Sequence, residues 1–164
     1  MFVDMKKLIA FLTLLILIPS LTAAQGSSVE PVSLEEALKI APAEDRKILV
    51  DVYAAWCPYC QRMESNVYTD EDVLEAISDY FVWVRINVES DQKVNYHGTE
   101  MTEAEFARAL DNENVPTTYF LNKEGAIVGV QPGYLAEDVF SNLLNFIGSD
   151  AFLNQSFDEY LEQR

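Results

Sequence analysis

The chain has 164 residues, is 49% hydrophobic and 12% aromatic, and carries a formal net charge of −16. This length and composition fit one globular domain with its own core, and they exclude a wholly disordered chain and a multi-span membrane protein. The acidic charge argues against binding to nucleic acid or to anionic membranes, because their phosphate groups would be repelled.

The N-terminal segment has the pattern of a secretory signal. A pair of lysines precedes an almost unbroken aliphatic run at 8–18, and small residues follow at 22–24. The run is shorter than the roughly 20 residues that a membrane-spanning helix needs. We predict a signal peptide at 1–24 and a protein that is periplasmic or otherwise exported, with an uncleaved anchor as the alternative. Residues 25–32 are small and polar, and we predict that they form a flexible linker.

Helix and strand patterns alternate from Ser33 onward. A capping box at 33–36 predicts a short helix through about Ile40 that Pro42 ends, and the β-branched and aromatic run at 47–54 predicts a strand buried on both faces. The next predicted elements are a helix from Pro58, a helix from Asp70, a strand at 81–88, a loop at 90–100 and a capped helix at 102–110. An antiparallel hairpin of strands at 117–121 and 126–130 follows. The last predicted helix presents Val139, Leu143 and Phe146 on one face and ends at Gly148.

This order is a βαβ unit followed by a ββα unit. Such a chain forms an α/β domain, a four-stranded mixed sheet with helices on both faces. We place this domain at 33–148 and a C-terminal helical tail at 149–164.

The chain has only two cysteines, Cys57 and Cys60, which are too few and too close for a structural disulfide framework. Cys57 stands where the strand ends and a helix begins, and Pro58 suits the first helical position. The positive end of the helix favours the thiolate, the attacking form of Cys57. Cys60, one turn later on the same face, is close enough to form a disulfide with Cys57 and shielded enough to stay protonated.

The alternatives for this pair are a structural bridge and a metal site. A tetrahedral site needs two more soft ligands, but the chain has one histidine, His97, in a polar segment, and no further cysteine. Capture of copper by the two cysteines and a methionine is the metal reading that best fits the composition.

Asp51 lies in the centre of the apolar strand, where burial raises the pKa of a carboxyl group. We interpret it as a catalytic residue that accepts the proton of Cys60, with a hydrogen-bonded structural acid as the alternative. Arg85, on the neighbouring strand, is a candidate partner for Asp51, although an exposed position at the surface is equally compatible with the pattern.

Residues 48–57 resemble the active-site strand of the thioredoxin superfamily, with an acid six residues before the first cysteine and Trp56 immediately before it. Val115, Pro116 and Thr117 match the loop whose proline is cis in that family, and Gly133 falls where the family places a glycine before the last helix. The resemblance covers about residues 47–147. Residues 62–64 and 132–134 are similar to exported bacterial members, including the SoxW-like group and the periplasmic thioredoxin module of the electron-conducting transmembrane reductase.

This resemblance implies a thioredoxin fold and a thiol:disulfide oxidoreductase. Its expected substrates are proteins that contain disulfides, and its expected electron donor is a membrane thiol reductant. The expected redox group is the Cys57–Cys60 disulfide, with no organic cofactor. The protein is expected to be a monomer. Trp56 and Tyr59 flank the cysteines and offer apolar contact to a substrate, with packing of the loop as the alternative for Trp56. The residues expected to bind substrate are Trp56, Pro58, Tyr59, Val115, Pro116 and Thr117.

Two departures from the family bear on the redox role. The pair Pro58-Tyr59 between the cysteines is that of glutaredoxins, but the glycine pair with which glutaredoxins bind glutathione is absent, so glutathione is not expected. No histidine between the cysteines stabilises the thiolate strongly, which favours a reductase over an oxidase. A disulfide-forming oxidase and a non-catalytic copper-binding chaperone remain the alternative functions.

Overall fold

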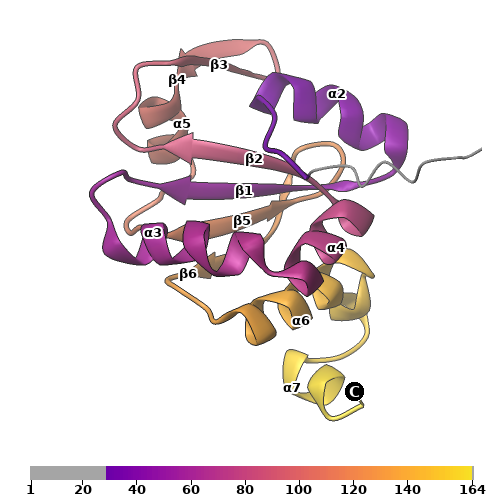
Figure 1. Ribbon diagram of the computed structural model, residues 1–164. Coiled ribbons are helices and arrows are strands. Elements are labelled where there is room, and N and C mark those ends of the chain that lie inside the picture. The colour runs from indigo at the N-terminus through magenta and orange to yellow at the C-terminus, as the bar shows by residue number, and fades with distance from the viewer. Residues whose placement is uncertain (1–28, 164) are drawn as a thin grey trace, which may run out of the picture.

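The computed structural model describes residues 29–163, so the predicted signal peptide lies outside the described residues. Its centre is a four-stranded sheet in the order β2-β1-β5-β6 (Figure 1). The strands are β1 (Lys47–Tyr53), β2 (Phe81–Asn87), β5 (Thr117–Leu121) and β6 (Ile127–Pro132). Strand β1 is parallel to β2 and antiparallel to β5, which is antiparallel to β6. The predicted mixed α/β sheet is therefore confirmed.

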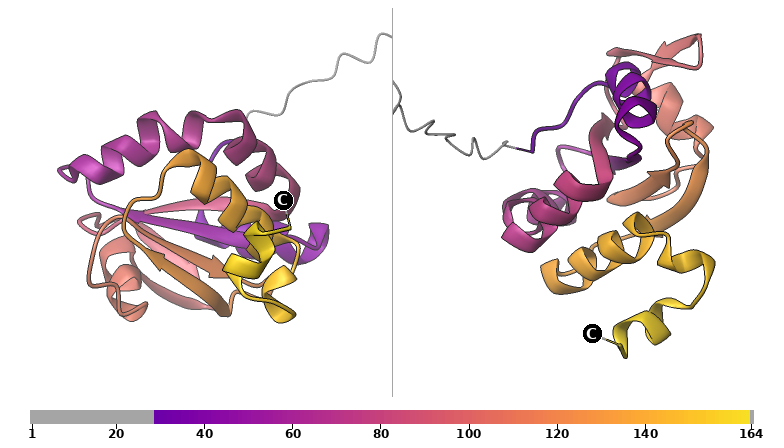
Figure 2. Two further views of the ribbon diagram at one scale, coloured as in Figure 1. Left: turned by 90° about the horizontal axis from the view of Figure 1, so that it is seen from below. Right: turned by 90° about the vertical axis from the view of Figure 1, so that its right-hand side faces the viewer.

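Helices cover both faces of the sheet (Figures 1 and 2). On one face α2 (Leu34–Glu44) and α5 (Glu103–Ala109) pack on the side chains of Ile48, Val50 and Val52. On the other face α3 (Pro58–Ser65), the 3-10 turn η1 (Val67–Thr69), α4 (Glu71–Tyr80) and α6 (Glu137–Gly148) pack on a second cluster that includes Leu49 and Phe120. The alternation of β1 side chains between the two clusters explains why this strand is apolar almost throughout. None of the helices within 29–163 is long and apolar enough to cross a membrane.

The first helix is longer than predicted. Helix α2 continues through Pro42 to Glu44, although we expected the proline to end it. A proline removes one N–H donor, and here it lies in the last turn, where little helix remains to be disrupted. The actual end is Asp45, which adopts a left-handed conformation with φ 55° and donates its N–H to the carbonyl of Ala41.

The prediction of a loop at 90–100 was wrong, because a two-stranded hairpin occupies this segment. Strands β3 (Lys93–Tyr96) and β4 (Thr99–Thr102) pair antiparallel. The chain reverses at His97 and Gly98, which have φ values of 52° and 85°, as a two-residue hairpin turn requires. The Tyr96 hydroxyl donates to the carbonyl of Gly125 at 2.8 Å, so the hairpin is tied to the β5–β6 turn.

The buried face of α6 also differs from the prediction. Phe140, Leu144 and Ile147 point into the core, whereas Val139 is 38% exposed. The spacing of the three buried residues is that of one helix face, displaced by one residue from the face that we expected. Phe146 is buried as well, because the C-terminal tail covers it.

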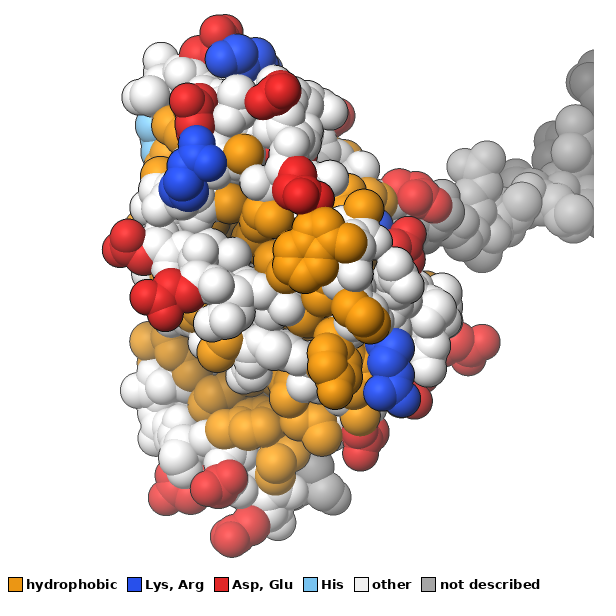
Figure 3. Space-filling view, turned by 90° about the vertical axis from the view of Figure 1, so that its left-hand side faces the viewer, with side chains coloured by type: hydrophobic (Ala, Val, Ile, Leu, Met, Phe, Trp, Pro, Cys, Tyr) orange, Lys and Arg blue, Asp and Glu red, His pale blue; other side chains and the backbone are white. Residues whose placement is uncertain are grey.

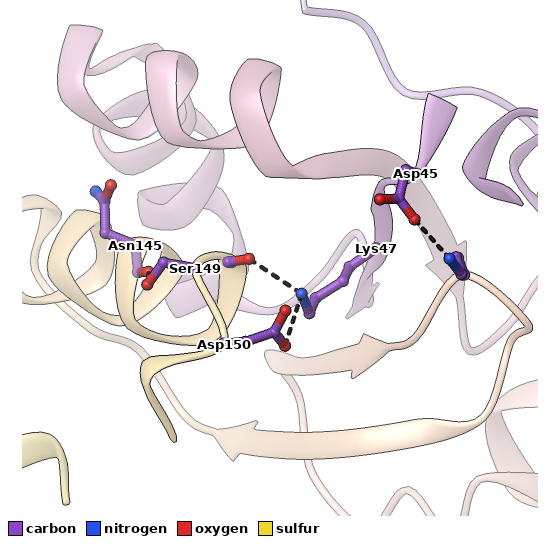
Figure 4. A network of polar contacts seen from close by, with 7 residues as sticks. Asp45, Lys47, Asn145, Ser149 and Asp150 are labelled. Carbon is purple, nitrogen blue, oxygen red and sulfur yellow. Dashed lines mark hydrogen bonds and ion pairs between the residues drawn. The ribbon is translucent and has the colours of Figure 1, made fainter. Parts of the chain in front are cut away.

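The tail contains the 3-10 turn η2 (Ala151–Leu153) and the short helix α7 (Phe157–Leu161). The ring of Phe146 lies 5.3 Å from that of Phe157 and 5.2 Å from that of Tyr160. Lys47 holds the start of the tail, since its ammonium group lies 2.9 Å from the Asp150 carboxylate and donates to the carbonyl of Gly148 at 3.0 Å (Figure 4). The tail is thus fastened to the first residue of β1.

The N-terminal approach to the fold touches the edge of the sheet. Of the predicted linker, residues 29–32 are described, and Val32 donates its N–H to the carbonyl of Trp83 at 2.8 Å. Val32 thereby forms a parallel bridge with Val84 on the edge strand β2.

Candidate active site

Cys57 is the N-cap of α3, at the point where the chain leaves β1. Its sulfur accepts a hydrogen bond from the backbone N–H of Cys60 at 3.2 Å, and Pro58 occupies the first turn without sacrificing a donor. The N-terminus of α3, with the Cys60 N–H directed at the Cys57 sulfur, therefore stabilises negative charge there. This is the placement predicted from the spacing of the two cysteines.

Cys60 lies one turn deeper and is 3% exposed. Burial, with a smaller contribution from its hydrogen bond to the Cys57 side chain, raises the pKa of Cys60 to about 12. Both cysteines are free thiols in this structure. The two sulfurs thus differ in kind: one faces hydrogen-bond donors, and the other is kept protonated by an apolar environment.

The loop before β5 lies against the first cysteine. The Cys57 thiol donates to the carbonyl of Val115 at 3.6 Å, and the Val115–Pro116 peptide bond is cis. Thr117 is buried within β5, and its hydroxyl donates to the carbonyl of Asn114 at 2.8 Å. Val115 and Pro116 therefore lie at the site, whereas Thr117 acts on it by fixing the loop.

Two large aromatic side chains that adjoin the buried cysteines in the sequence are exposed. Trp56 is 64% exposed and Tyr59 is 56% exposed. The Tyr59 ring lies 6.0 Å from the ring of Tyr134, over which the Arg62 guanidinium is placed at 5.4 Å. Figure 3 shows this end of the molecule, where apolar side chains gather and acidic ones lie around them. Most of the Trp56 side chain is thus accessible to a partner and is not buried by packing against the loop.

Asp51 lies beneath the cysteines and is 1% exposed. Arg85, its register partner on β2, places Nε 3.0 Å from an Asp51 carboxylate oxygen, and the Arg85 side chain is only 18% exposed. Burial raises the pKa of Asp51 above its ordinary value, and the charge of Arg85 opposes that shift. The sequence left the position of Arg85 open, and the structure pairs it with Asp51.

Two residues near Asp51 were not identified from the sequence. Glu64 lies 3.4 Å from the Arg85 guanidinium, at the exposed end of this ion pair. Tyr68 is buried against Trp83, and burial together with the nearby charge of Asp51 raises the pKa of its hydroxyl well above the usual range. Tyr68 follows Val67 in an otherwise polar segment just beyond the active-site helix, and this pair was the available signal. Within 29–163, no three His, Cys, Asp or Glu side chains are grouped so that they could hold a metal ion.

The comparison with known families agrees with this geometry. The model of the thioredoxin-like domain matches residues 34–148, most of the described chain. The chain belongs to this family. With both cysteines of its active site in place, the thioredoxin-like domain is a thiol:disulfide oxidoreductase.

Similar proteins are known in sequence and in structure. The thiol:disulfide interchange protein DsbD of Pseudomonas sp. (strain JR1 / K1) is 37% identical over 62 residues, which are 38% of this chain but 11% of that much longer protein. A thioredoxin from Thermus thermophilus is 29% identical with a TM-score of 0.59, over 73% of this chain and 87% of the other. A thioredoxin-fold protein from Helicobacter pylori, 23% identical with a TM-score of 0.60 over 73% and 80% of the two chains, shares the fold.

Proposed function

We propose that this thioredoxin-like domain reduces disulfides of protein substrates outside the cytoplasm. Cys57 and Cys60 are its redox group, without an organic cofactor, and a membrane thiol reductant restores the dithiol. The observation that carries the proposal is the asymmetry of the pair: the Cys57 sulfur accepts an N–H at the start of α3, while burial holds Cys60 as a thiol. Only such a pair attacks first with one sulfur and resolves with the other.

The exchange proceeds in two steps. The Cys57 thiolate attacks one sulfur of the substrate disulfide, the substrate S–S bond breaks, and one substrate thiolate leaves and takes up a proton. Cys60 then loses its proton to Asp51 and attacks the Cys57 sulfur of the mixed disulfide. The second substrate thiolate is released, so two electrons have passed to the substrate and the enzyme retains a Cys57–Cys60 disulfide.

The substrate is held by the surface around the cysteines. The exposed side chains of Trp56, Pro58 and Tyr59 supply apolar contact, and the backbone at Val115 and Pro116 lines up an extended segment of the substrate beside the attacking sulfur. Thr117 keeps that loop in place through its hydrogen bond to Asn114. One monomer contains every residue that these contacts require.

The proposed location outside the cytoplasm and the proposed electron donor are supported by the N-terminal sequence and by the likeness to DsbD. The pattern at 1–24 favours export, and mass spectrometry of the protein from a periplasmic extract should find a chain that begins near Gln25. The likeness to DsbD supports a membrane reductant as the donor. Recovery of the whole chain from the cytoplasm would overturn the proposed location.

The reaction is tested by insulin reduction with dithiothreitol as electron source. We expect turnover by the wild-type protein, none by Cys57→Ser, and a stable mixed disulfide with insulin in Cys60→Ser, which attacks but cannot resolve. The equilibrium with glutathione should give a reduction potential below about −200 mV, as for reductases. A potential near about −120 mV would make the protein an oxidase instead. Tight Cu(I) binding without insulin turnover would favour the chaperone.

A further inference from the structure

A hollow of about 310 Å³ opens beside the cysteines. It is lined by Trp56, Val88, Asn112, Glu113, Asn114 and Val115. We name it the Trp56–Glu113 recess. Val115 joins it to the active site, because the Val115 carbonyl accepts the hydrogen bond of the Cys57 thiol. The recess therefore lies next to the attacking sulfur.

The lining of the recess is partly apolar and partly polar. Trp56, Val88 and Val115 supply the apolar part, Asn112 and Asn114 are neutral, and Glu113 is the one charged residue among those that line it. Glu113 is exposed and forms no ion pair with another residue in the described part of the chain. Its carboxylate is thus free to meet a charge from outside.

The surroundings reinforce this negative charge. The residues adjoining the lining segments are Glu89, after Val88, and Asp111, before Asn112, and both are exposed acids. No lysine or arginine stands within two residues of any lining position in the sequence. Arg62, which lies over the Tyr134 ring, is not among the lining residues. An acidic side chain in the recess would meet the like charge of Glu113, and no lysine or arginine is among the lining residues.

A lysine or arginine side chain matches both parts of the recess. Its methylene stem packs along apolar walls while its charged end reaches the rim, a division that these two side chains adopt wherever an apolar surface borders water. The charged end would then lie near the Glu113 carboxylate, and the two opposite charges attract each other most strongly at low salt.

We propose that the Trp56–Glu113 recess selects the substrate by accepting a lysine or arginine side chain next to the cysteine that Cys57 attacks. This selection rests on the proposed attack of Cys57 on protein disulfides and names the substrate class, a disulfide flanked by a basic residue. Glu113 is the specificity-determining residue, and it takes no part in bond making or breaking.

The test isolates the attack step in the Cys60→Ser background. Two synthetic peptides, identical except for lysine or glutamate beside their single cysteine, carry thionitrobenzoate on that cysteine. Cys57 attacks the peptide sulfur, the peptide–thionitrobenzoate bond breaks, a Cys57–peptide disulfide forms, and thionitrobenzoate leaves as a coloured thiolate. The second-order rate is read from its absorbance at low and at high salt.

We expect the lysine peptide to react about tenfold faster than the glutamate peptide at low salt, with most of the preference lost at 1 M salt. Adding Glu113→Gln should reduce the preference to about threefold or less. Glu75→Gln, an exposed site on α4 that changes the net charge equally, should leave it near tenfold.

Three results would overturn the inference. The first is no preference in the Cys60→Ser parent, and the second is a preference that stays near tenfold in Glu113→Gln. The third is an equal loss with Glu75→Gln, which would assign the effect to the charge of the whole protein. Insulin turnover by the wild type reports separately on the proposed function. Insulin turnover without a Glu113-dependent preference would refute only the proposed selection of basic residues. A Glu113-dependent preference without insulin turnover would refute only the proposed reductase function.

Discussion

Replacing Asp51 with asparagine tests where the proton of Cys60 goes. With a pKa of about 12, only about one Cys60 in 30,000 is a thiolate at pH 7.5, so the resolving attack needs a group that takes the proton as the sulfur reacts. A positioned general base accelerates such a step by about 10²–10⁴. Asp51→Asn should therefore slow resolution at pH 7 by about a hundredfold or more.

The same substitution has an opposite effect if Asp51 acts through its charge alone. The negative charge of Asp51 is one of the smaller causes that raise the pKa of Cys60. An amide would remove this charge, make Cys60 easier to ionise, and accelerate its attack. The two roles thus predict changes of opposite sign in one rate.

The assay follows release of thionitrobenzoate from a mixed disulfide with Cys57, between pH 5 and pH 10. Wild-type release should fall at low pH, as Asp51 is protonated, and should level off above the pKa of Asp51, whereas release by Asp51→Asn should rise with pH throughout the range because only hydroxide is left to take the proton. The difference between the two proteins should shrink toward pH 10, where hydroxide takes the proton. Release by a folded Asp51→Asn variant that is as fast as wild type at pH 7, or faster, would refute the role of Asp51 as proton acceptor.

Three further predictions concern stability and are read from urea unfolding. Burial raises the pKa of Asp51 in the folded chain above its unfolded value of about 3.9. The stabilisation from the neutral carboxyl group is therefore complete below about pH 3.9 and is lost as the pH rises through the folded-state pKa. The free energy of unfolding of the wild type minus that of Asp51→Asn should fall over this window, and a difference that rises with pH would contradict the prediction. Leu144→Ala, at a fully buried position in α6, should lower the free energy of unfolding by about 2–5 kcal/mol, and a loss below about 1 kcal/mol would contradict the packing described. Gly148→Ala would place a Cβ 2.6 Å from the Tyr80 Cβ. The resulting overpacking should lower the free energy of unfolding by about 1–3 kcal/mol, which exceeds the gain of at most about 1 kcal/mol from the better helix propensity of alanine. Gly129→Ala should lower it less, because the nearest atom to the new Cβ would lie at 3.3 Å.

Local signals in the sequence located the sheet and the first-attacking cysteine. The apolar run at 47–54 and the capping box that begins at Thr102 are decided by neighbouring residues, and both formed as predicted. Cys57 could be assigned to a helix N-cap because Pro58 marks the first turn. These features need no information from distant parts of the chain.

Other features depend on contacts that a linear pattern does not record. The β3–β4 hairpin has one buried side chain, Val94, so hydrophobic alternation could not reveal it, and only the turn at Gly98 was a signal. Tyr68 comes to lie near Asp51 because η1 folds back over the sheet. The Trp56–Glu113 recess is assembled from three separate segments of the chain.

The depth of the Cys57 sulfur has a consequence for which disulfides can react at all. The Cys57 side chain is 3% exposed, whereas the neighbouring side chains of Trp56 and Tyr59 are 64% and 56% exposed. A disulfide that is to react has to come within bonding distance of this buried sulfur. A disulfide on a flexible segment of its own protein can make that approach more readily than one held rigidly in a flat surface.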